Sequence, residues 1–155
     1  MKFFLRYWLP IVAWLGVIFF GSTDLMSAEH TSRFIVPFLV WLKPDISPET
    51  LATIHLIVRK DAHVAEYAIL GLLLLRAATL ITNLRWSPAI LCLAVMTTSL
   101  FVAVTDELHQ TFVASRGPSA TDILIDSSGA FFGLLIGLIF RINRPVKVEK
   151  AQPDC

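Results

Sequence analysis

Apolar residues gather in four long runs along the chain, and polar stretches separate them. The runs extend from about Tyr7 to Thr23, from Ala62 to Ile81, from Pro88 to Thr105 and from Ile123 to Phe140. A helix that crosses the hydrocarbon core of a bilayer needs roughly 20 mostly apolar residues, with a range of about 17–25. Each run has this length or nearly so. The pattern predicts an all-α integral membrane protein with a four-helix transmembrane bundle.

The stretch between the first two runs is predicted to hold two shorter elements. The segment Phe34–Leu42 ("FIVPFLVWL") is apolar but too short to span, and Pro37 interrupts it, so we expect it to lie in the interface or to re-enter the membrane. A helix is expected to start at Ser47, a favoured N-cap, with Pro48 in its first position. One face of this helix carries Leu51, Ile54 and Val58. This pattern predicts a short interfacial helix that leads into the second run.

The first run also has some features of a secretory signal peptide. Lys2 and Arg6 precede it, and Met26–Ala28 ("MSA") resembles a weak cleavage region. The run is rich in tryptophan and phenylalanine, however, and no small-x-small site follows it directly. These features favour a retained transmembrane helix.

The composition agrees with a membrane protein. Of the 155 residues, 55% are hydrophobic and 16% are charged, and the mean hydropathy is +0.69. Soluble domains average roughly 45–50% apolar and about 25% charged residues. The chain has room for one bundle, which we place at residues 1–143, followed by a basic, disordered cytoplasmic tail at 144–155. No basic face with interleaved aromatic residues is present, so nucleic acid is not expected as a partner.

The distribution of lysine and arginine predicts the orientation, because cytoplasmic loops carry an excess of these residues. The N-terminus carries Lys2 and Arg6, the connection between the second and third runs carries Arg85, and the C-terminal tail is basic. The loop between the third and fourth runs carries Arg116 alone, and the long first loop balances basic residues with acidic ones. We therefore expect both termini in the cytoplasm, and both longer loops, with the interfacial helix, outside.

This orientation brings polar residues from several helix ends to one depth, near the outer membrane surface. They are Lys60, His63, Glu66 and Tyr67 of the second helix, Asp106, Glu107, His109 and Gln110 of the third, Asp122 and Asp126 of the fourth, and Arg116 in the loop. Helical residues three or four apart are neighbours. His63 therefore lies beside Glu66 and Tyr67, and Asp122 beside Asp126. The pattern predicts one outward-facing polar site.

Asp126 is the most informative of these residues. It lies more than a turn inside the fourth run, where a carboxylate is costly. We therefore expect it to face the bundle and to pair with Arg116, His63 or Lys60. Polar residues at helix ends are also often hydrated, snorkelling or capping residues without a further role. That is the alternative for Lys60, Glu107, Tyr67 and Asp122.

The face of Asp126 continues through Gly129, Gly133 and Gly137. Stripes of small residues let helices approach closely, within one chain or between copies of a chain. Close helix packing is the simpler expectation, and a homo-oligomer through this face is the second.

Two motifs at the polar level resemble the signatures of the VanZ-like family. The stretch "KDAHVAEYAILGLLL" is similar to K-x-x-H-x-x-x-Y-x-x-L-G, and its matching residues are Lys60, His63, Tyr67, Leu70 and Gly71. The stretch "DELHQTFVASRGPSATDILIDSSGAFFG" is similar to the second signature, through Asp106, Glu107, Gln110, Arg116, Asp122, Asp126, Gly129 and Gly133. Ser22 in "FFGSTDLMS" matches the serine-rich start of the family's first loop. One departure is "VASR", where the family often has Pro-Gly before the arginine.

The resemblance spans roughly Leu9 to Phe140 and implies a small multi-pass protein of the bacterial cytoplasmic membrane, with membrane lipids as partners. The founding member of the family is associated with low-level resistance to the glycopeptide teicoplanin. A link to glycopeptide resistance is therefore an expectation that the resemblance implies.

Three functions are compatible with this site. The first is binding of an anionic lipid, glycolipid or cell-wall intermediate. Its binding residues would be Lys60, Arg116, Ser22, Glu66, Tyr67, Gln110 and Asp122. The second is an intramembrane enzyme for a lipid-linked substrate, with His63 and Asp126 in acid–base roles and Asp106 and Glu107 as further acids. The third is a structural or interaction protein in which the polar groups form a satisfied network.

No cofactor is expected from the sequence. The acidic residues and His63 offer ligands that suit Mg²⁺, Mn²⁺ or Ca²⁺ better than Zn²⁺. The chain contains no H-E-x-x-H or C-x-x-C motif, however, so we expect no metal site.

Overall fold

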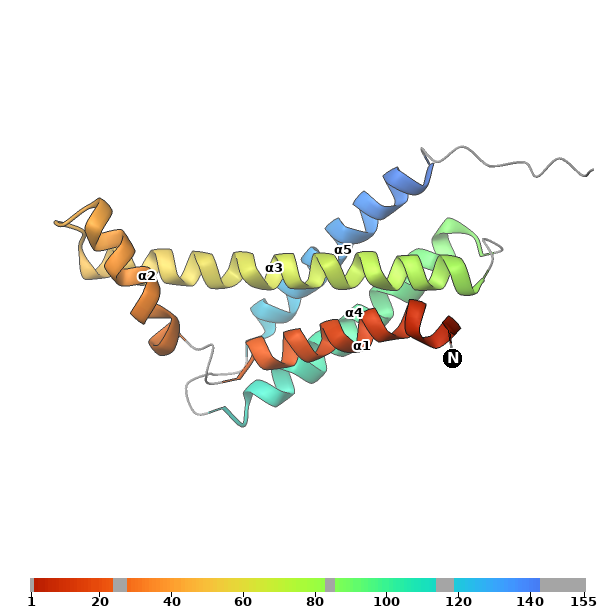
Figure 1. The fold of residues 1–155 in the computed structure, drawn as a ribbon, viewed down its shortest axis with the longest axis horizontal. Coiled ribbons are helices and arrows are strands. Elements are labelled where there is room, and N and C mark those ends of the chain that lie inside the picture. Colours follow the sequence, from red (N-terminus) through yellow and green to blue (C-terminus); the bar gives the residue numbers. More distant parts are fainter. Residues whose placement is uncertain (1, 24–27, 83–85, 114–118, 143–155) are drawn as a thin grey trace, which may run out of the picture.

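The computed structural model describes residues 2–23, 28–82, 86–113 and 119–142, and these ranges hold five α-helices and no strand. The helices are α1 (Lys2–Gly21), α2 (Ala28–Leu42), α3 (Pro48–Ile81), α4 (Pro88–Gln110) and α5 (Ala120–Ile142), shown in Figure 1. The predicted all-α fold is confirmed. The predicted tail at 144–155 lies outside the described residues.

The long helices have the character of membrane spans. By length and composition, α3, α4 and the Ala120–Phe140 part of α5 can each cross a membrane, and Leu5–Gly21 of α1 is a shorter apolar helix. Large apolar side chains point outward from the bundle; Phe101, for example, is 72% exposed and Leu124 is 71% exposed. An apolar surface this extensive is typical of helices that lie in a membrane. Three of the four predicted spans therefore meet the requirements of length and composition, and α1 is shorter.

The predicted interfacial helix is not a separate element in the structure. It starts as expected, since Ser47 Oγ accepts a hydrogen bond from the Thr50 N–H at 3.2 Å and Pro48 is the first helical residue. It then continues without a break into the second apolar run, to form the 34-residue helix α3. The physical reason is that no glycine or proline stands between Pro48 and Gly71. The polar residues between Arg59 and His63 change the surroundings of the helix but do not end it.

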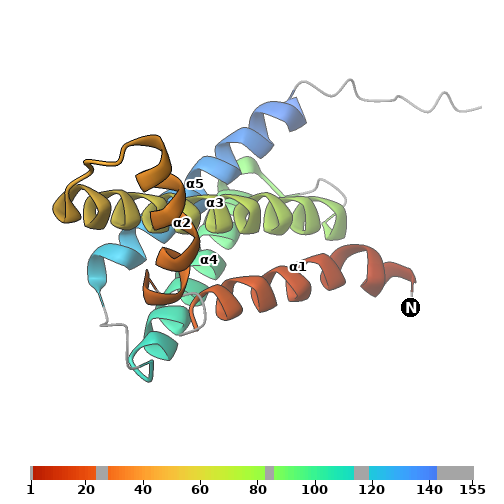
Figure 2. The same cartoon turned by 60° about the vertical axis from the view of Figure 1, so that its left-hand side comes forward.

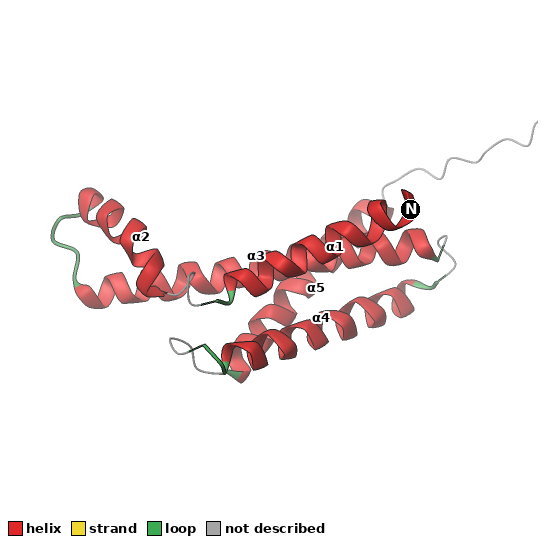
Figure 3. Ribbon diagram, turned by 60° about the horizontal axis from the view of Figure 1, so that its bottom comes forward, coloured by secondary structure: helices red, strands yellow, loops and turns green. Residues whose placement is uncertain are grey.

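The apolar segment around Pro37 is the second half of α2, and the helix continues through this proline. Among the described helices, α2 contacts α3 alone. Figures 1 and 3 show α2 folded against the N-terminal part of α3, beyond the ends of α1, α4 and α5. The two helices form a hairpin that extends away from the bundle.

The closest helix pair is α3 and α5, and glycines make this approach possible. A Cβ atom on Gly133 would lie 1.9 Å from the Ala68 carbonyl oxygen, and one on Gly129 would lie 2.4 Å from the Val64 carbonyl oxygen. The glycine stripe thus packs helices within one chain, as the simpler expectation held. A contact between two copies of the chain through the same glycines stays a prediction, and it would have to displace α3.

The bundle has two ends with different character. The start of α1 and the end of α5 lie at the end of the bundle where α3 turns into α4, as Figures 1 and 2 show. The end of α1, the end of α4 and the start of α5 meet at the opposite end. The helix directions that the sequence predicted for the bundle are therefore present, and they bring the predicted polar residues together.

Apolar packing fixes the position of these polar residues. A buried cluster of Ile18, Tyr67, Leu70, Val102, Ala103 and Ala130 joins α1, α3, α4 and α5. The indole Nε1 of Trp14 also donates a hydrogen bond to the Glu66 carbonyl oxygen at 2.8 Å, which attaches α1 to α3. No pattern in the sequence pointed to this contact of Trp14.

Candidate functional site

The carboxylate of Asp106 is the centre of a buried hydrogen-bond network. Ser22, directly after α1, donates from Oγ to Asp106 Oδ2 at 2.6 Å. Gln110, one turn further along α4, donates from Nε2 to the same oxygen at 3.1 Å and to Ser22 Oγ at 3.2 Å. All three residues are buried. The network joins the end of α1 to the end of α4, and it gives Ser22 a definite place in the site.

A second buried pair joins α3 to α5. His63 Nδ1 lies 3.3 Å from Asp126 Oδ1. This confirms that Asp126 faces the bundle, and it places His63 next to Asp126 as one of its predicted partners. Arg116, another predicted partner, lies outside the described residues.

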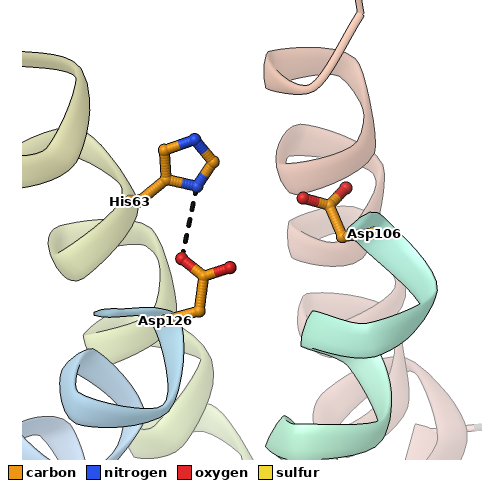
Figure 4. Close-up of side chains that lie close together, drawn as sticks. All are labelled: His63, Asp106 and Asp126. Atoms are coloured by element: carbon orange, nitrogen blue, oxygen red, sulfur yellow. Dashed lines mark ion pairs between the residues drawn. The ribbon is translucent and has the colours of Figure 1, made fainter. Parts of the chain in front are cut away.

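The network and the pair meet in the same space. Figure 4 shows His63, Asp126 and Asp106 with their polar atoms directed into the region between α3, α5 and α4. One ligand atom from each of the three residues lies within 4.8 Å of the others. Residues from three helices thus form one buried cluster, which we call the acid–histidine cluster.

Tyr67 lies one turn from His63 on α3 and is fully buried. Its hydroxyl group has no hydrogen-bond partner among the described residues. A buried tyrosine usually pairs its hydroxyl group, so a polar ligand or water beside it would complete this site. The alternative of an exposed interfacial aromatic does not hold for Tyr67.

Glu107 has a more structural position than the sequence suggested. It is 5% exposed, and its Oε1 accepts a hydrogen bond from the Ser119 N–H at the start of α5. The carboxylate therefore links the end of α4 to the beginning of the next helix. The alternative of a hydrated residue at a helix end is wrong for Glu107, because its side chain is buried and accepts the hydrogen bond from Ser119.

Lys60 and Asp122 form the rim of the site. Lys60 Nζ lies 3.4 Å from Asp122 Oδ1, and their side chains are 36% and 21% exposed. Asp122 lies in the first turn of α5 rather than at its N-cap. Its carboxylate therefore connects α5 to α3 across the rim in addition to favouring the helix dipole.

Glu66 and His109 lie beside α1. The Glu66 Oε1 atom is 3.1 Å from the place of a Cβ on Gly21, so its carboxylate lies against the end of α1. The His109 ring contacts the Phe19 ring edge-on, with centroids 5.9 Å apart. Of the predicted site residues, those that the structure describes therefore all lie at one end of the bundle, on α3, α4, α5 or the end of α1.

One of three comparisons with known proteins found a match. A protein-family model described as VanZ/LLP1 matches residues 7–141, which is most of the chain. Neither the comparison with curated proteins nor that with solved structures gave a significant match. The matched range contains α2, α3 and α4 and every residue of the acid–histidine cluster.

Proposed function

This chain belongs to the VanZ/LLP1 family of membrane proteins, and on that basis we propose that it crosses the bacterial cytoplasmic membrane four times. In this arrangement α1, α3, α4 and α5 span the membrane, both termini are cytoplasmic, and the polar end of the bundle faces outward. The positions of the helix ends support the arrangement, and the arginines and lysines near the termini set its direction.

The orientation is tested by reporter fusions. A cytoplasm-active reporter fused after Pro153 is expected to be active, and a periplasm-active reporter at the same place inactive. A fusion in the segment Lys43–Pro48 is expected to give the opposite result. External activity at Pro153 would overturn the proposed direction.

We further propose that the outward-facing site binds the polar headgroup of an anionic envelope lipid or glycolipid. The observation that carries this proposal is the convergence of polar side chains from four helices at one end of an otherwise apolar bundle. Lys60 is suited to an anionic group, because its side chain is partly exposed at the rim of the site. Its contact with Asp122 is long, at 3.4 Å, so an anionic headgroup could compete with this carboxylate. Tyr67 and Gln110 supply buried polar atoms below it.

Native mass spectrometry of the protein, purified in a mild detergent, tests headgroup binding. We expect a co-purifying anionic lipid on the wild type and about tenfold weaker retention in Lys60→Gln, because the charge-assisted contact is lost. Lys43→Gln is the matched control, since Lys43 is an exposed lysine outside the site. Absence of lipid from the wild type, or equal retention in both variants, would contradict the proposal.

The proposed link to glycopeptide resistance is tested by the teicoplanin susceptibility of cells that express the wild type, Lys60→Gln or Lys43→Gln.

The His63–Asp126 contact favours one alternative function. A carboxylate beside a histidine orients the ring and raises its basicity, which suits a general base acting on a lipid-linked substrate. If the protein is such an enzyme, the wild type converts lipid-linked precursors into a product, and the His63→Gln variant does not. Headgroup binding alone predicts no such product.

A further inference from the structure

We propose that His63, Asp106 and Asp126 bind a divalent transition-metal ion, and that Mn²⁺ suits this set best. The three residues come from α3, α4 and α5, and they are 8%, 0% and 1% exposed. One ligand atom of each lies within 4.8 Å of the other two. Figure 4 shows the three side chains directed into one space.

A cation would balance the negative charge of the cluster. Asp106 and Asp126 are both buried, one carboxylate oxygen of each lies within 4.8 Å of the other, and an ionised carboxylate is costly to bury unless an opposite charge accompanies it. Among the described lysines and arginines near the cluster, Lys60 forms an ion pair. Its partner is Asp122 at the rim of the site. A divalent ion between the two aspartates would supply the charge that the buried pair needs.

Unpartnered buried atoms give a second and independent indication. Asp106 uses Oδ2 for its hydrogen bonds with Ser22 and Gln110, while its Oδ1 has no hydrogen-bond partner among the described residues. The same is true of Gln110 Oε1 and of the hydroxyl group of the fully buried Tyr67. Tyr67 lies one turn from His63 on α3, so its side chain neighbours a residue of the cluster. Buried polar atoms that lack a protein partner are suited to an ion and its bound water.

The surroundings of Asp106 resemble the support that metal ligands generally have. Residues that hydrogen-bond to a ligand fix its orientation, and their loss typically lowers metal affinity about 10–100-fold. Ser22 and Gln110 hold Asp106 in this way through Oδ2 and leave Oδ1 for an ion. At His63, Nδ1 is 3.3 Å from Asp126 Oδ1, a separation that suits two adjacent ligands of one ion.

The donor set determines the class of ion. The set is mixed: its imidazole nitrogen suits first-row transition metals, and its two carboxylate oxygens suit Mn²⁺ among them, whereas Mg²⁺ and Ca²⁺ prefer oxygen ligands throughout. With bonds of about 2.2 Å, opposite ligand atoms stand about 4.4 Å apart. The ligand atoms of the cluster lie within 4.8 Å of one another, and rotation of the aspartate side chains can adjust these distances. The sequence motifs did not predict this site, because its ligands come from three separate helices. It is also independent of the proposed headgroup binding, since all three ligands belong to the protein.

The test uses the full chain, purified in detergent without a histidine tag and treated with EDTA. Titration with MnCl₂, followed by electron paramagnetic resonance, is expected to give one bound ion per chain. Asp106→Asn and His63→Gln are expected to raise the dissociation constant at least about tenfold. Asp61→Asn is the matched control, because Asp61 is an exposed aspartate on the same helix as His63. The affinity of this variant for Mn²⁺ should equal that of the wild type.

A spectroscopic measurement covers the case in which Asp106→Asn does not fold. Electron spin-echo modulation of Mn²⁺ on the wild type is expected to show a directly bound nitrogen. This signal should be absent from His63→Gln and present in His55→Gln, in which another histidine of α3 is replaced. No saturable Mn²⁺ binding by the wild type, binding without a nitrogen signal, or equal binding by the wild type and the folded ligand variants would overturn the proposal.

Discussion

Replacing Gly133 by alanine is expected to lower the free energy of unfolding by at least about 3 kcal/mol, at the upper end of the usual cost of overpacking. The added Cβ would lie 1.9 Å from the Ala68 carbonyl oxygen. This oxygen belongs to the main chain of α3, so it cannot rotate away as a flexible side chain would. The two closest helices would have to separate, and the contacts that position His63 against Asp126 would separate with them.

Gly16→Ala is the matched control for this substitution. Gly16 also lies inside a helix, and a Cβ there has no atom within 4 Å. Alanine favours a helix by about 1 kcal/mol relative to glycine, so this variant should be as stable as the wild type or slightly more so. Unfolding of both variants in detergent, followed by circular dichroism, gives the comparison. Equal stabilities would mean that α3 and α5 do not approach as closely as described.

Replacing Asp106 by alanine is expected to destabilise the protein by about 2 kcal/mol, since a buried group left without its partner costs about 1–3 kcal/mol. The hydroxyl group of Ser22 and the amide of Gln110 both lose their acceptor Oδ2. Asp106→Asn keeps a carbonyl oxygen in this position, so its effect on stability should stay below about 1 kcal/mol. Asp61→Ala removes an exposed carboxylate and should change little.

A double-mutant cycle identifies the origin of the Asp106 effect. If the Ser22 contact carries much of it, Ser22→Ala should cost clearly less in the Asp106→Ala background than in the wild type. Fully additive effects would show that the two residues do not depend on each other.

The Asp106 variants also separate a working site from a purely structural network. An Asp106→Asn protein that is as stable as the wild type but binds no lipid or metal speaks for a working site, and unchanged binding speaks for a network that only holds the helices.

The level at which the polar residues lie could be predicted because helices in a bundle of this kind alternate in direction. Once four runs were recognised, His63, Asp106, Gln110 and Asp126 had to come to the same end of the bundle. For the same reason, the candidate partners of Asp126 could be limited to Arg116, His63 and Lys60, and His63 lies next to it in the structure. The match of Ser22 to a family motif was weak, yet its hydroxyl group forms the shortest of the contacts to Asp106.

Other features depended on distances that no sequence pattern contains. A hydrated position at the helix end was the alternative for Glu107, but its carboxylate accepts a hydrogen bond from the Ser119 N–H at the start of α5. The contact of Trp14 with the Glu66 carbonyl oxygen depends on how α1 lies against α3. The start of α3 was predicted at the correct residue, whereas its continuity was not. The charged stretch at Arg59–His63 looked like a boundary between two environments, and such a boundary need not interrupt a helix.

The continuity of α3 sets the distance between its N-terminal end and the acid–histidine cluster. With a rise of about 1.5 Å per residue, the start of the helix at Pro48 stands about 22 Å beyond His63 along the axis. No proline or glycine divides this length, so a sharp kink in it would break main-chain hydrogen bonds inside the helix. We therefore expect a displacement of the N-terminal end of α3, where α2 packs, to tilt the helix as a whole and so to move His63 relative to Asp106 and Asp126.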